Sequence, residues 1–148
     1  MQGFDAVDLR LISLLQKNAR CPVKQLAAQV FMSPPAVTAR LMRLEKAGAI
    51  TGYQPMMNLQ MLGFSVIAFV SLGLVPGDKQ RFSREIAKSP NVMECHHVTG
   101  DYSMLIKACF RTTKELDAFV GELQQYGRTH TQIVFSTVTE ARTPELAT

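Results

Sequence analysis

The sequence contains no tryptophan and few aromatic residues, which make up 7% of its 148 positions. Its nine glycines and seven prolines are too few for a low-complexity or collagen-like chain. The longest apolar run, residues 64–75, is interrupted by Ser65, Ser71 and Gly73, whereas a membrane-spanning helix needs about 20 apolar residues. Hydrophobic residues still reach 47% of the chain. These features exclude fibrous, disordered and membrane proteins and predict a soluble, folded chain with no membrane partner.

Cysteine is also scarce. Cys21, Cys95 and Cys109 are odd in number and widely spaced, which is typical of reduced thiols in a protein core rather than of a disulfide framework. The N-terminus lacks the basic stretch and following apolar segment that mark a signal peptide. We therefore expect a cytoplasmic protein.

Motifs of enzymes are missing as well. We find no phosphate-binding loop, zinc-ligand spacing, nucleophile elbow or paired carboxylates, so we expect neither an enzyme nor a cofactor. Cys95 and His97 would share one face of a strand beside His96, which invites a metal site. Only two ligands converge there, and His130 is distant in sequence, so packing in a core or an interface is the favoured interpretation.

Charge is distributed unevenly along the chain. Residues 1–60 carry seven Lys or Arg and three Asp or Glu, a net charge of +4, whereas residues 61–148 carry nine of each sign. A small basic module joined to a neutral one predicts that the first binds a polyanion. The alternative is a basic face that serves only solubility.

Apolar residues at helical spacing predict three helices in the basic module, at about residues 5–18, 23–30 and 34–47. A tight turn at residues 31–32 separates the second helix from the third. Gly48 is a natural stop for the third helix. The sequence therefore predicts two short helices joined by a brief turn, with one helix before them.

The third helix has a strong start signal, because Ser33 is a good N-cap and Pro34 at the first helical position loses no hydrogen bond. Its apolar stripe consists of Val37, Leu41 and Leu44. The outward-facing residues would then be Pro35, Thr38, Ala39, Met42 and Arg43.

This arrangement matches a helix-turn-helix that reads the DNA major groove. Small residues let the backbone approach the DNA, hydroxyl groups bond phosphates or base edges, and Arg grips guanine or phosphate. The predicted reading residues are Ser33, Pro35, Thr38, Arg40 and Arg43, with Lys24 and Lys46 as phosphate contacts.

Two alternatives remain open for these residues. A structural three-helix bundle also needs Leu-rich faces and some exposed Arg. Arg40 lies near the apolar stripe, so its alternative role is an ion pair with an acid such as Glu45.

The second half predicts a βαββαβ order, which is the ferredoxin-like arrangement of a four-stranded antiparallel sheet with both helices on one face. The strands are expected at 64–74, 92–99, 102–110 and 129–139, and the helices at 79–88 and 113–126. The fold class is therefore α+β, with an N-terminal winged helix-turn-helix. The expected divisions are a DNA-binding domain at 1–50, a wing or linker at 51–63, a ferredoxin-like domain at 64–140 and a tail at 141–148.

One face of this sheet would be apolar and uncovered. Strand alternation places Ile67 and Phe69 on the face away from the helices. The last strand would add either Ile133 with Phe135 or Val134 with Val138. Soluble chains rarely expose such a patch, so we expect a homodimer, which would also space two reading helices about one DNA turn apart.

Several segments of the first half agree in order and spacing with one known family. They are residues 8–12 (DLRLI), 15–20 (LQKNAR), 26–27 (LA), 32–41 (MSPPAVTARL), 44–50 (LEKAGAI) and 52–53 (GY). These resemble the winged helix-turn-helix half of the Lrp/AsnC family of bacterial and archaeal transcription regulators. Pro22 stands where a Ser or Thr usually caps the second helix, and Phe31 where a Gly often makes the turn, which leaves the angle of the second helix open.

The resemblance extends to the second half, at residues 92–102 (VMECHHVTGDY) and 129–134 (THTQIV). It implies that the domain dimerises through its sheets, that dimers assemble further into tetramers or octamers, and that an amino acid binds between dimers near the Gly100 turn. The effector-binding residues implied are Gly100, Asp101, Tyr102, Ser103, Thr131 and Gln132.

Ser103 departs from the family, which usually has an Asp directly after the aromatic residue of this turn. The departure predicts an amino-acid ligand that is altered, weakly bound or absent. Asp101 with Tyr102 either anchors an ammonium group or only solvates a hairpin turn. We therefore interpret the protein as a sequence-preferring transcription regulator that binds double-stranded DNA. The alternatives are an architectural DNA-bending or wrapping protein without effector, and a metabolite-binding module with a vestigial helix-turn-helix.

Overall fold

The computed structural model describes residues 3–144, which divide into two compact units. One unit comprises the chain up to Met56 together with the segment that begins at Glu140, and the other comprises Met57–Thr139. The first division falls inside the predicted linker at 51–63. The segment after Glu140 contacts the helical unit, where the Gln16 side-chain amide donates to the Thr143 hydroxyl at 2.9 Å. The remainder of the predicted tail, 145–148, lies outside the described residues.

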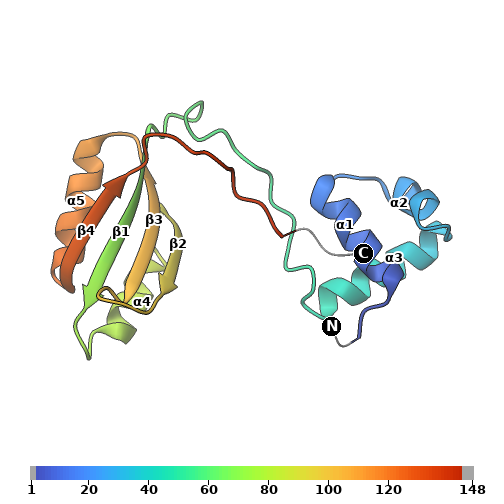
Figure 1. Ribbon diagram of the computed structural model, residues 1–148, viewed down its shortest axis with the longest axis horizontal. Coiled ribbons are helices and arrows are strands. Elements are labelled where there is room, and N and C mark those ends of the chain that lie inside the picture. Colours follow the sequence, from blue (N-terminus) through green and yellow to red (C-terminus); the bar gives the residue numbers. More distant parts are fainter. Residues whose placement is uncertain (1–2, 145–148) are drawn as a thin grey trace. The chain divides into compact units, whose positions relative to one another are not determined.

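The helical unit contains α1 (Ala6–Lys17), α2 (Val23–Gln29) and α3 (Pro34–Lys46) (Figure 1). The three predicted helices are confirmed to within two residues at each end. They pack around a core of buried apolar side chains, namely Leu11, Leu26, Ala27 and Val37. Residues 51–58 form neither helix nor strand.

The helix ends follow the predicted capping. The Asp5 carboxylate accepts a hydrogen bond from the Asp8 N–H at 2.9 Å, and the Asp8 carboxylate accepts one from the Asp5 N–H at 3.1 Å, which makes a capping box at α1. Ser33 caps α3 by accepting from the Ala36 N–H at 3.4 Å. Pro22 gives α2 no side-chain cap.

The second unit is a four-stranded antiparallel sheet of order β2-β3-β1-β4 with two helices, which confirms the ferredoxin-like prediction (Figure 1). Its elements are β1 (Val66–Leu74), α4 (Lys79–Ile86), β2 (Val92–His97), β3 (Met104–Phe110), α5 (Thr113–Gln124) and β4 (Gly127–Ile133). Strands β2 and β3 pair as the predicted hairpin, with a longer connection than expected.

Both helices cover the same face of the sheet. Alternate residues of β1 are buried, as the sequence pattern predicts, and they meet Phe82 of α4 and Phe119 of α5 in one apolar core. The buried residues of β1 are Val66, Ala68, Val70 and Leu72. On its opposite face β1 carries Ile67 and Phe69, which are half-buried.

The last strand differs from the prediction. It ends at Ile133, six residues before the expected Thr139, because its pairing with β1 stops at the Ala68–Ile133 pair. The final bond runs from the Val134 N–H to the Ile67 carbonyl at 2.9 Å. Phe135 therefore lies outside the strand.

The register also corrects the predicted faces. Ile133 lies opposite Ala68, on the side of the helices, so the pairing of Ile133 with Phe135 on the uncovered face is wrong. Val134 continues the alternation of the uncovered face, but Val138 lies beyond the strand and is fully exposed. The residues that β4 contributes to the uncovered face are polar, namely Arg128, His130 and Gln132. Among residues 3–144, every helix is too short or too polar to cross a bilayer.

Candidate nucleic-acid interface

The outward face of α3 is exposed, as the helical pattern predicts. Of the seven residues that the sequence assigns to DNA contact, six are exposed and Arg40 is half-buried. The exposed ones are Lys24, Ser33, Pro35, Thr38, Arg43 and Lys46. Met42 lies on the same face and is also exposed.

The hydroxyl groups on this face have partners within the protein. Thr38 is exposed and donates its hydroxyl proton to the Pro34 carbonyl at 3.1 Å, so its methyl group and its hydroxyl oxygen, but not its proton, are left for contact with a ligand. The Ser33 hydroxyl oxygen is occupied by the cap of α3 and retains its proton for donation. The two residues thus offer different groups to a ligand.

Arg40 is bound to acids of α1. Its Nη1 lies 2.6 Å from Asp5 Oδ2 and 2.8 Å from Asp8 Oδ1, and its side chain is 25% exposed. The expected partner Glu45 is wrong, because Glu45 instead accepts a hydrogen bond from the Tyr53 hydroxyl at 2.9 Å. Arg40 therefore joins α3 to the start of α1.

Arg43 is held at one end only. Its Nη2 binds Asp8 Oδ2, while the side chain remains 55% exposed. Asp8 itself is fully buried. Burial raises the pKa of Asp8, but hydrogen bonds from Arg40, the Asp5 N–H and Arg43 outweigh burial and hold that pKa below its ordinary 3.8. Asp8 is therefore ionised at neutral pH.

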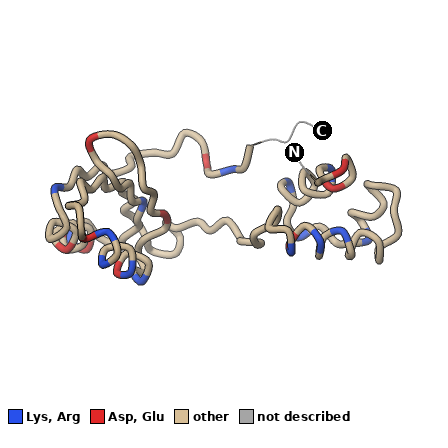
Figure 2. The backbone as a smooth tube through the Cα atoms, turned by 90° about the horizontal axis from the view of Figure 1, so that it is seen from below, with Lys and Arg blue, Asp and Glu red and all other residues tan. Residues whose placement is uncertain are grey.

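The charge of this unit suits a polyanion. Blue basic positions outnumber red acidic ones along the three helices, whereas the sheet unit carries both signs (Figure 2). Two of the three acids in residues 1–60, Asp5 and Asp8, are engaged with arginines. The remaining basic side chains therefore make the electrostatic potential around α3 positive.

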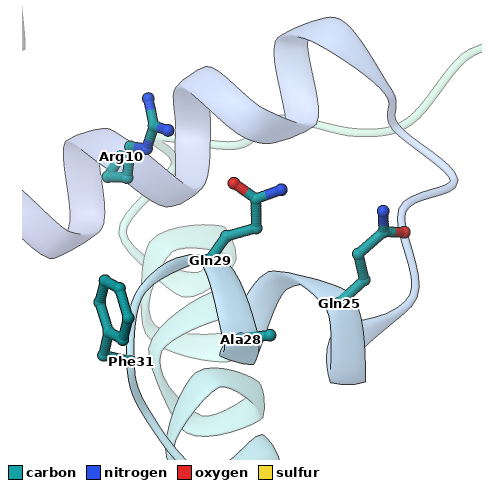
Figure 3. A pocket seen from close by; sticks show the side chains of 5 residues that line it. All are labelled: Arg10, Gln25, Ala28, Gln29 and Phe31. Atoms are coloured by element: carbon teal, nitrogen blue, oxygen red, sulfur yellow. The ribbon is translucent and has the colours of Figure 1, made fainter.

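A shallow hollow between α1 and α2 was not predicted from the sequence. It is lined by Arg10, Gln25, Ala28, Gln29 and Phe31 (Figure 3). Phe31 is 96% exposed and has a positive φ of 54°. The polar residues of α2 that line the hollow have the spacing of any solvated helix face, so no sequence signal marks it.

The Gly100 turn carries a second group of predicted residues. Ser103 is hydrogen-bonded to β1. Its N–H donates to the Leu72 carbonyl and its hydroxyl accepts from the Leu74 N–H, both at 3.1 Å. Arg128, which the sequence did not single out, lies over the Tyr102 ring at 4.8 Å and donates to the Asp101 carbonyl at 3.2 Å.

The remaining predicted effector residues lie elsewhere on β4. Thr131 is opposite Val70 on the helix side, and Gln132 is opposite Phe69 on the uncovered face. His130 lies 6.1 Å from the Tyr102 ring, measured between ring centres. The structure thus brings Tyr102, Arg128 and His130 together and places Thr131 and Gln132 on opposite faces.

Cys95 and His97 share the helix-facing side of β2, opposite Ile106 and Met104. Burial raises the pKa of the Cys95 thiol, and Cys95 packs against the sheet core. No group of three or more potential metal ligands occurs within residues 3–144.

Two family models match the chain. One described as the Lrp/AsnC ligand binding domain matches residues 67–144, and one described as winged helix-turn-helix DNA-binding matches residues 4–51. Two curated relatives agree with them. The HTH-type transcriptional regulator FL11 of Pyrococcus furiosus is 28% identical, with 90% of this chain and 91% of that protein covered. The proline dehydrogenase transcriptional activator of Rhodobacter capsulatus is 30% identical, with 97% of each chain covered.

Solved structures give the same result. LrpC of Bacillus subtilis matches with a TM-score of 0.87 and 27% identity, covering 95% of this chain and all of that one. AsnC of E. coli matches with a TM-score of 0.86 and 27% identity, covering 97% and 99%. The basic three-helix unit, the ferredoxin-like sheet and these matches together establish that the chain belongs to the Lrp/AsnC family of transcription regulators.

Proposed function

We propose that this protein is a sequence-preferring DNA-binding regulator in which the outward face of α3 enters the major groove. The observation that carries the proposal is the exposure of this face within residues 1–60, which carry a net charge of +4. Pro35, the Thr38 methyl group and Met42 offer apolar contact to thymine methyl groups, and the Arg43 fork fits guanine or phosphate. Lys24 and Lys46 contact phosphates and set the register on the duplex.

Arg40 has a different role in this proposal. Because its guanidinium is bound to two carboxylates and its side chain is only 25% exposed, it serves as an internal ion-pair partner and not as a base reader. The alternative role that the sequence allowed for it, a structural ion pair, is supported with Asp5 and Asp8 as the acids.

The regulator acts as a homodimer in our proposal. Ile67, Phe69 and Leu105 lie on the sheet face that neither α4 nor α5 covers within the described part of the chain. A second copy would bury these apolar side chains and place two α3 helices on one duplex. Further assembly into tetramers or octamers would use other surfaces.

A small carboxylate-bearing effector, of the amino-acid type, would bind near the Gly100 turn. The family model for this half describes a ligand-binding domain. Arg128 supplies a cation beside Tyr102, whereas Ser103 is occupied by β1 and does not replace the carboxylate usual at that position. An effector-free architectural role remains the second candidate, and footprinting separates the two, because wrapping gives long periodic protection.

The test is selection of a preferred duplex from random DNA, followed by titration and footprinting with and without the twenty amino acids. Arg43→Ala should weaken binding to the selected site about tenfold at fixed salt, because one charged donor fork is lost. Arg84→Ala, which removes an exposed Arg from α4, is the charge-matched control and should leave binding unchanged. Equal affinity of the wild type for selected and scrambled duplexes would contradict sequence-preferring regulation.

A further inference from the structure

Asp8 is the only fully buried ionisable carboxylate among residues 3–144, and it lies on a helix that carries none of the predicted base readers. Its Oδ1 accepts from Arg40 at 2.8 Å. Its Oδ2 accepts from Arg43 and, at 3.1 Å, from the Asp5 N–H. One carboxylate of α1 thus binds both arginines of α3.

The two arginines are held differently. Arg40 Nη1 is shared between Asp5 and Asp8, and the Arg40 side chain is mostly buried. Its positive charge therefore compensates the buried negative charge of Asp8. Arg43 binds Asp8 through Nη2, and its side chain is 55% exposed, so its other N–H groups remain available to a ligand. The two arginines are not interchangeable, because only Arg43 combines a contact to Asp8 with a side chain that is more than half exposed.

Anchoring one end of a guanidinium changes what the rest of it can do. A free Arg side chain has a large rotamer entropy that is lost on binding, and a side chain already held in one orientation loses less. An anchored planar fork also meets a base edge with defined geometry, whereas an unanchored one follows the nearest phosphate. The negative charge of Asp8 further offsets the basic charge beside α3, which limits sequence-independent attraction.

We propose that Asp8 is a positioning residue for DNA recognition: its buried carboxylate holds the Arg43 guanidinium so that the remaining donors reach a base edge. This inference rests on the proposed DNA-binding function. Asp8 does not touch DNA in this scheme, and its effect on binding passes entirely through Arg43.

Asp8→Asn keeps the size of the side chain and an oxygen acceptor but removes the charge. We expect its affinity for the selected duplex to fall about tenfold, while its affinity for a scrambled duplex stays equal or rises. The ratio of the two affinities is the measured quantity. Asp5→Asn is the matched control, because it removes the charge of one acid from Arg40 without touching Arg43, while Asn still caps α1, and it should preserve the ratio.

A double-mutant cycle separates positioning from stability. In the Arg43→Ala background, Asp8→Asn should cause no further loss of preference, because the group that it positions is gone. Additive losses would overturn the proposal and leave Asp8 a structural role only. Measurements are made well below the unfolding temperature of each variant, which circular dichroism determines.

Arg43→Lys keeps the test decisive if Asp8→Asn does not fold. Lys retains the charge but lacks the planar fork, so it should retain binding to scrambled DNA and lose the preference for the selected site. Retention of the wild-type preference by Arg43→Lys, or by a folded Asp8→Asn, would overturn the proposal. Failure of the wild type to discriminate the two duplexes would instead refute the proposed function.

Discussion

At the residue scale, the helical unit depends on two carboxylates near the start of α1. Asp5 caps the helix and binds Arg40, whereas Asp8 completes the capping box and binds both Arg40 and Arg43. The hydrogen bond from Arg40 lowers the pKa of Asp5, and the bonds to Asp8 lower its pKa against the effect of burial. Asp8 is the buried member of the pair, and removing an arginine that binds it would leave its negative charge less compensated, which is costly.

These shifts predict a pH dependence for the helical unit. A carboxyl whose pKa is lower in the folded state stabilises the fold when ionised. The contribution of Asp5 and Asp8 is therefore fully present above their unfolded pKa of 3.8 and is lost as the pH falls through the lower folded values. Urea unfolding of the helical unit should show a falling midpoint below about pH 4. Asp8→Asn should flatten this profile, and an unchanged profile in that variant would contradict the role of Asp8.

At the scale of elements, the turn between α2 and α3 is made by an unusual residue. Phe31 has the left-handed φ that favours glycine, and its ring is almost entirely in solvent. An L-residue with a side chain pays roughly 1–2 kcal/mol for this conformation. Because the ring is exposed, its packing within the helical unit does not offset this conformational cost.

Phe31→Gly should stabilise the helical unit. Relief of the left-handed strain exceeds the extra entropy of glycine in the unfolded chain by roughly 0.5–1 kcal/mol. Thermal unfolding followed by circular dichroism measures the gain. Phe31→Ala is the control, because it removes the same exposed ring but keeps a Cβ and should not stabilise; equal stabilisation by both variants would refute the strain.

At the scale of the whole molecule, the two units divide the work. The helical unit carries the basic charge and the exposed face of α3, and the sheet unit carries one covered and one uncovered face. At the middle of the uncovered face, Phe69 lies between Lys107 and Gln132 on the neighbouring strands. A partner of the same chain would cover this face.

Phe69→Glu should convert the proposed dimer into monomers at micromolar concentration. A carboxylate at this position faces Lys107 within the folded unit, so the fold tolerates it, but the interface would bury an added charge. Sedimentation velocity measures the change. Gln124→Glu adds the same charge on exposed α5 and should leave the dimer intact. A wild-type monomer, or a Phe69→Glu dimer, would contradict dimerisation through the sheet.

The sequence by itself determined the helices of the first unit, because the cap at Ser33, the stop at Gly48 and the apolar stripe of α3 act within a few residues. The alternation of β1 was determined in the same way, since buried and outward positions repeat every second residue, and the βαββαβ order followed from the succession of strand and helix patterns. The exposed face of α3 followed from the helical spacing of its apolar stripe, Val37, Leu41 and Leu44.

Only the tertiary structure decided which acids bind Arg40 and Arg43, because Asp5 and Asp8 lie more than thirty residues earlier in the chain. It likewise decided that the Ser103 hydroxyl accepts a hydrogen bond from β1, and that Ile133 faces the helices once β4 pairs with β1. Local preferences act between near neighbours, whereas ion pairs and strand register depend on which distant segments meet in space. For this reason the exposed face of α3, which we propose contacts DNA, was predictable as a helix face, and the ion pairs of its arginines were not.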